Sequence, residues 1–121
     1  PEARRRLEQA AAGGAGAERT QQFEDGVAHY RAGELATAEA AFTALLDRHA
    51  VPEAYYNRAA IRLLRDEPLA ARADLERYLE LKPEGEDHAA IREALEVPAV
   101  QWVPKSGGVA FLLGAVLRGA G

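Results

Sequence analysis

Apolar residues recur at helical spacing along most of the chain, in blocks that glycine or proline separates. In the first clear block, Phe23, Val27 and Tyr30 fall three and four positions apart. That spacing places them on one face of an amphipathic helix, with Gly26 on the same side. Gly33 is expected to end this helix, because glycine adopts the left-handed backbone conformation at a helix C-terminus without a steric penalty.

Prolines, glycines and one acidic turn mark the other helix boundaries. Pro52 suits the first turn of a helix, where a missing N–H removes no hydrogen bond. Asp66 is expected to be the N-cap of a helix with Pro68 in its first turn. The stretch GGAG at 13–16 is expected to break an N-terminal helix. The predicted helices cover 1–12, 17–32, 34–48, 52–65, 69–81, 87–96 and 109–118, and residues 97–108 are expected to be extended or irregular.

Composition supports an all-α fold. Hydrophobic residues make up 48% of the 121 residues, and much of that share is alanine, which favours helix. Dense runs of β-branched residues are absent from the sequence. A chain of this length has room for one small domain.

An internal repeat is present. The segment GVAHYRAGELATAEAAFTALL at 26–46 aligns without a gap on AAIRLLRDEPLAARADLERYL at 59–79, an offset of 33 residues. Small residues recur where the two helices of a hairpin would cross closely, and bulky residues recur beside them. The identical pairs are Glu34/Glu67, Ala38/Ala71, Ala40/Ala73 and Leu46/Leu79, and the pairs similar in kind are Gly26/Ala59, Phe42/Leu75 and Phe23/Tyr56.

A helix–turn–helix unit with a period near 34 residues resembles the tetratricopeptide repeat (TPR). The Ala-x3-Phe element of that repeat is present as Ala38 to Phe42 and, in kind, as Ala71 to Leu75. Pro83 stands at the closing proline of the second unit, and the first unit lacks that proline. The tryptophan and tyrosine positions of the repeat hold other residues here, namely Gln22 and Tyr55, and His29 and Arg62.

The resemblance implies an all-α helical-hairpin solenoid, a right-handed superhelix with helical flanks. Because two repeats are fewer than the three or so usually needed for stability, the flanks or another chain must cover the open ends. The expected parts are an N-terminal helix and Gly-rich linker at 1–16, a TPR-like domain at 17–96 and a Pro/Gly-containing linker with an apolar segment at 97–121. The domain divides into repeats over 19–51 and 52–85 and a capping helix over 87–96.

Net charge and amino-acid composition limit the kinds of partner and site that this chain could have. The net charge of −4 argues against a nucleic-acid partner, which needs a concentrated basic face. The sequence has no cysteine, which rules out disulfides and cysteine metal sites but leaves the compartment open. A cytoplasmic location is favoured over a periplasmic or membrane-associated one.

Candidate catalytic chemistry is sparse. No two of the histidines His29, His49 and His88 stand at metal-ligand spacing, so no metal or cofactor is expected. Lys105-Ser106 echoes the end of a phosphate-binding loop, but the preceding glycines and strand are missing. Because no acid, base and pocket assemble in the pattern, we do not expect an enzyme.

The resemblance to TPR proteins implies that the first helix of each repeat lines a concave surface for a peptide or helix of a partner. Asn57 alone matches the chaperone-clamping subset of these domains, so a chaperone carboxylate clamp is not expected. The remaining surface is apolar and aromatic with one cation, which suits a hydrophobic peptide. The predicted partner-binding residues are Phe23, Val27, Tyr30, Arg31, Tyr56, Asn57, Ala60, Leu63 and Leu64.

The C-terminal tail carries a run of apolar residues, VAFLLGAVL at 109–117, that is too short to span a bilayer. Three places could bury it: the chain's own groove, a partner subunit in an oligomer or assembly, or a membrane. The predicted tail-docking residues are Trp102, Phe111, Leu112, Leu113 and Val116.

The sequence therefore predicts a non-catalytic protein–protein interaction module, an adaptor or small subunit that binds a partner segment in the concave groove. The alternative is a membrane-associated assembly subunit anchored by its apolar tail. A third class, the regulatory fragment of an enzyme, would require a catalytic domain in another part of a longer protein.

Overall fold

The chain is described by a computed structural model, which gives the backbone of residues 2–85 and 88–98 and the side chains from residue 16 onward within those ranges. Every regular element in these ranges is an α-helix. The helices are α1 (Glu2–Arg31), α2 (Leu35–Arg48), α3 (Pro52–Leu64), α4 (Pro68–Leu81) and α5 (His88–Leu95). The all-α prediction is confirmed for this part of the chain, and the predicted helix at 109–118 lies outside it.

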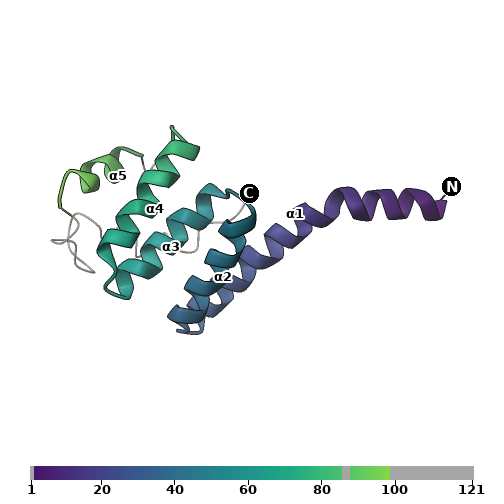
Figure 1. The fold of residues 1–121 in the computed structure, drawn as a ribbon, viewed down its shortest axis with the longest axis horizontal. Helices are drawn as coiled ribbons and strands as arrows, with labels where there is room; N and C mark the ends of the chain where they lie inside the picture. The colour runs from purple at the N-terminus through teal and green to yellow at the C-terminus, as the bar shows by residue number, and fades with distance from the viewer. Residues whose placement is uncertain (1, 86–87, 99–121) are drawn as a thin grey trace.

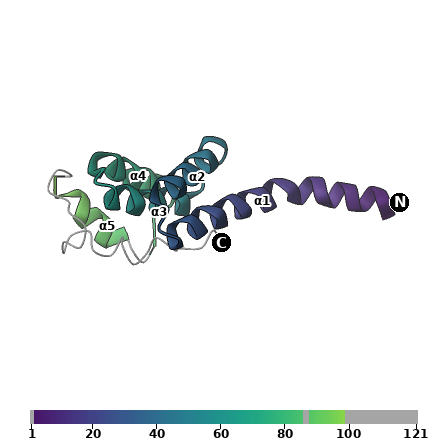
Figure 2. The ribbon, with the colours of Figure 1, turned by 90° about the horizontal axis from the view of Figure 1, so that it is seen from below.

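The helices pack on one another in chain order. α1 contacts α2, α2 contacts α3, α3 contacts α4, and α4 contacts α5 (Figure 1). The N-terminal half of α1 runs on beyond α2 and projects away from the other helices, and the view from below shows the same projection (Figure 2). The packed body therefore comprises the C-terminal half of α1 and the four shorter helices.

The predicted break at residues 13–16 is wrong. α1 continues as one helix of 30 residues through GGAG. Each glycine weakens a helix by about 1 kcal/mol relative to alanine, but it does not by itself force the chain out of the helical conformation. Alanines on both sides of the stretch favour continuation, since alanine is the strongest helix former.

The turns after α1 and α3 have the same backbone geometry. Gly33 has φ +80° and Asp66 has φ +60°, so both adopt the left-handed conformation. The N–H of Gly33 donates to the carbonyl of Tyr30, and the N–H of Asp66 donates to the carbonyl of Leu63. In both turns the next N–H reaches back five residues, Glu34 to His29 and Glu67 to Arg62, which completes a Schellman motif.

This geometry corrects the role predicted for Asp66. The N-cap of α4 is Glu67, and no side chain caps that helix. Asp66 instead closes α3 from the left-handed position that Gly33 occupies after α1. Aspartate tolerates this conformation better than most residues, which is why it can stand where the first turn has glycine.

The core is formed by the small and bulky residues that the repeat predicted. Ala38, Ala59 and Ala71 have no exposed surface, so each lies where neighbouring atoms enclose it completely. At Gly26, an added Cβ would lie 2.7–2.9 Å from ring atoms of Phe42. The absence of a side chain at Gly26 thus makes room for the Phe42 ring. The buried apolar residues are Phe23, Ala38, Phe42, Leu45, Ala54, Tyr56, Ala59, Ala60, Ile61, Leu63, Ala71, Leu75, Tyr78, Ile91 and Ala94.

Candidate interaction surface

The partner-binding residues predicted from the sequence lie on α1 and α3, as expected, but most are enclosed by the protein itself. Only Arg31 is exposed among them. A fully buried side chain contacts a partner only after the core has repacked, so the buried members serve the core in this structure. The buried members are Phe23, Tyr56, Asn57, Ala60 and Leu63, and the half-buried members are Val27, Tyr30 and Leu64.

The accessible members gather at the C-terminal ends of the two helices. Val27, Tyr30 and Arg31 occupy the last turns of α1. Val27 stands three residues before Tyr30 and four before Arg31, which places both on the same side of the helix as Val27. Leu64 is the last residue of α3, the position equivalent to Arg31 at the 33-residue offset. We call Val27, Tyr30, Arg31 and Leu64 the α1–α3 face. It offers apolar and aromatic surface together with one cation.

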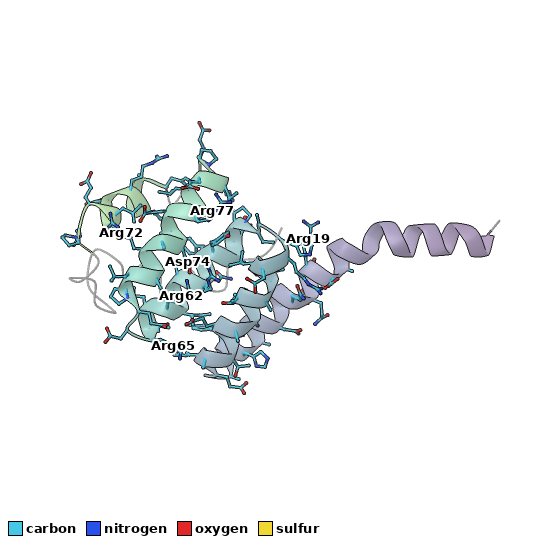
Figure 3. The ribbon with its side chains drawn as sticks, in the orientation of Figure 1. Arg19, Arg62, Arg65, Arg72, Asp74 and Arg77 are labelled. Carbon is cyan, nitrogen blue, oxygen red and sulfur yellow. The ribbon has the colours of Figure 1, made fainter. Side chains whose placement is uncertain are left out.

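A buried ionic network ties α3 to its neighbours. Asp74 on α4, whose side chain is 3% exposed, accepts from Arg58 Nε at 2.9 Å and from Arg58 Nη2 at 2.7 Å. Arg62 donates to the same carboxylate at 3.0 Å, and Arg58 also donates to Thr43 on α2 at 3.2 Å. Figure 3 shows Asp74 and Arg62 meeting between α3 and α4. The network fixes α3 against both α2 and α4 through charge-assisted hydrogen bonds.

The electrostatics of Arg58 follow from that position. Burial lowers the pKa of its guanidinium, but the hydrogen bonds and the negative charge of Asp74 outweigh burial and raise the pKa overall. Arg58 also stacks over the Tyr55 ring, with its guanidinium carbon 5.6 Å from the ring centroid. Arg58 is therefore a permanent cation held in a structural role, and it is not offered to a ligand.

A second cluster joins α2 to the turn before α4. Arg65 donates to Glu39 at 2.8 Å and lies 3.7 Å from the carboxylate of Glu67. Burial raises the pKa of the Glu39 carboxyl, but hydrogen bonds from Glu67 and Arg65 outweigh it, so the pKa is lowered overall. The same hydrogen bond to Glu39, followed by burial, raises the pKa of Glu67.

His29 and His88 have structural contacts. Nδ1 of His29 lies 3.2 Å from a carboxylate oxygen of Glu34, across the Schellman turn. His88 is 2% exposed, packs on the Tyr78 ring and hydrogen-bonds the carbonyl of Lys82. Across the described residues no group of three or more histidine or carboxylate side chains could hold a metal ion. Within the same ranges, no helix combines the length and apolarity that crossing a membrane requires.

A hollow of about 350 Å³ lies between α1 and the connection from α2 to α3. Its lining includes the exposed Arg19, labelled in Figure 3, and Glu53, which pairs with Lys82 at 3.3 Å. The hollow thus presents one cation beside a carboxylate that is already neutralised. It contains no pairing of a nucleophile with a base.

The ionic network around Asp74 was not predicted from the sequence. A signal was present in the sequence, since Arg58 and Arg62 stand four residues apart on α3 and Arg65 follows at its C-cap. Such a spacing ordinarily indicates a solvated face, and only the packing of α2 and α4 shows that Arg58 and Arg62 are largely covered. The predicted tail-docking residues Trp102, Phe111, Leu112, Leu113 and Val116 lie outside the described residues.

Comparison of the chain with protein-family models, with curated proteins and with solved structures finds no match.

Proposed function

We propose that this chain is a non-catalytic protein–protein interaction module whose two helical hairpins form a tetratricopeptide-like solenoid. The supporting observation is the repetition of the Schellman turn: Gly33 and Asp66 close their helices with equivalent hydrogen bonds at an offset of 33 residues. Small residues enclosed in the core accompany both turns. Repeated hairpins of this kind present rigid, equivalent helix faces, which suits binding to an extended or helical partner segment.

The partner contacts the α1–α3 face in this proposal. Val27 and Tyr30 pack against the core on one side and keep part of their surface accessible on the other. Covering such side chains is favourable, because complete burial of a large apolar side chain contributes about 1.5–3 kcal/mol. Arg31 adds one exposed cation at the edge. The fitting partner is therefore an apolar segment with an acidic residue beside it.

Site-specific crosslinking tests the location of this surface. A photo-crosslinking amino acid replaces Arg31 in one variant, and it replaces Arg77, an exposed arginine on α4, in the control. In the native lysate we expect a discrete crosslinked partner from position 31 and none from position 77. Equal crosslinks from both positions, or crosslinks from position 77 alone, would show that the α1–α3 face is not the binding surface.

A matched pair of double variants tests the contribution of the side chains. Tyr30→Ala/Leu64→Ala removes two half-buried side chains from the α1–α3 face, and Leu46→Ala/Leu79→Ala removes two from α2 and α4. Both are compared at equal helicity by circular dichroism. The proposal requires that the first pair weaken capture of the crosslinked partner and that the second pair leave it unchanged.

A further inference from the structure

The described part of the chain leaves two large hydrophobic side chains exposed, Leu69 at 68% and Val97 at 37%. Leu69 lies in the first turn of α4, and Val97 follows α5. An exposed leucine is by itself unremarkable on a protein surface. What distinguishes this pair is that Arg72 connects the two residues.

Arg72 stands three residues after Leu69, so the two side chains are neighbours on one face of α4. Its guanidinium donates to the backbone carbonyl of Val97 at 3.3 Å. Figure 3 places Arg72 on the side of α4 that faces α5. The chain after α5 is thus held beside α4, about one turn beyond Leu69. We call Leu69, Arg72 and Val97 the α4 edge.

The sequence that follows at once is apolar. Residues 99–104 read AVQWVP, and Trp102 is the sole tryptophan of the protein. Trp102 stands five positions after Val97, and an extended chain of that length spans at most about 17 Å. The turn of α4 that carries Leu69 is therefore within reach, because Val97 is already hydrogen-bonded one turn further along that helix.

We propose that residues 99–104 dock in cis on the α4 edge, with the Trp102 indole covering Leu69. The indole ring is large enough to cover the Leu69 side chain, which is exposed in the described structure. The docked segment extends the cover that α5 gives to α4 and closes that open end of the helical stack. It leaves the α1–α3 face free, so this inference stands independently of the proposed function.

The sequence has no cysteine and one tryptophan, so an introduced cysteine is the single labelling site and Trp102 is the single indole that can quench the label. Bimane, a fluorophore that tryptophan quenches on contact, is attached to a Leu69→Cys variant of the full chain. We expect strong quenching that Trp102→Phe relieves several-fold. Bimane at Ala44→Cys on α2 and at Arg31→Cys on α1, both exposed positions, should not respond to Trp102→Phe.

Each other outcome overturns the proposal. Quenching at position 31 in place of position 69 would put the tail on the α1–α3 face, and the absence of quenching at position 69 would leave the α4 edge uncovered by Trp102. Quenching that disappears on dilution would show that the indole comes from a second copy. A second readout avoids the label: Leu69→Glu should shift Trp102 emission to longer wavelength at unchanged helicity, and Ala44→Glu should not.

Discussion

The substitution Gly26→Ala tests the closest approach in the core. The new Cβ would lie 2.7 Å, 2.8 Å and 2.9 Å from three atoms of the Phe42 ring. Phe42 is 0% exposed, so neighbouring protein atoms enclose the ring. Overpacking of this kind costs about 1–3 kcal/mol, while the better helix propensity of alanine returns about 1 kcal/mol. We expect a net loss of up to about 2 kcal/mol in the free energy of unfolding.

The same helix supplies the control. Gly16 also lies in α1, but no atom stands within 4 Å of a Cβ added there. Gly16→Ala therefore isolates helix propensity, and we expect it to stabilise the protein by about 0.5–1 kcal/mol. Urea unfolding followed by circular dichroism measures both variants. A loss of 1 kcal/mol corresponds to a decrease in Tm of about 4–8 °C for a domain of this size.

A double-mutant cycle identifies the cause. In a Phe42→Leu background the ring atoms that the new Cβ meets are gone, so Gly26→Ala should change sign and stabilise the protein as Gly16→Ala does. The coupling energy should be about 1–3 kcal/mol. If Gly26→Ala stabilises the wild-type protein, or destabilises it equally in both backgrounds, contact with Phe42 is not the reason for glycine at this position.

The remaining predictions concern the turns and the ionic clusters. Asp66→Gly should raise the free energy of unfolding and Gly33→Ala should lower it, each by about 1 kcal/mol in urea titrations, because both positions have positive φ. If both substitutions changed the free energy of unfolding in the same direction, or if neither changed it, the Schellman assignment would be contradicted. Asp74→Ala should lower stability by about 2–4 kcal/mol, since it removes the buried carboxylate that Arg58 and Arg62 share, and a loss below about 1 kcal/mol would show that solvent replaces the carboxylate. Glu67→Gln should stabilise the protein at neutral pH. Because the pKa of Glu67 is raised in the folded state, its favourable contribution to stability is present below its ordinary pKa and is lost as pH rises through the folded-state value. Glutamine stays neutral and keeps a hydrogen-bond donor for Glu39. Glu39 has the opposite sign, with stability present above its ordinary pKa and lost as pH falls through its lowered value, so Glu39→Gln should flatten the acid side of the stability–pH curve.

The helices themselves could be predicted closely from the sequence. The expected helices at 34–48, 52–65, 69–81 and 87–96 agree within one residue at each end with α2, α3, α4 and α5. This worked because apolar spacing, prolines and glycines act locally. Where a local signal was ambiguous, the prediction was wrong: GGAG was expected to break α1, but the helix runs through it.

The candidate surface was less predictable. Phe23 and Tyr30 share one apolar stripe in the sequence, yet the first is 2% exposed and the second is half-buried. Asp66 and Asp74 are both surface-type residues, yet one closes a helix at positive φ and the other is enclosed between two arginines. Nothing in the local sequence separates these cases, because each depends on which residues from another helix lie opposite.

The sequence alone determined the all-α character, the helix positions and the 33-residue repeat with its pairing of small and bulky residues. These follow from backbone propensity and side-chain periodicity, which act over a few neighbouring residues. The tertiary structure decided which side of each helix is covered, how α3 is clamped by Asp74, and where accessible surface is left at Arg31 and Leu69. Burial is a property of the contacts between helices distant in the chain, so it emerges only when the helices are packed together.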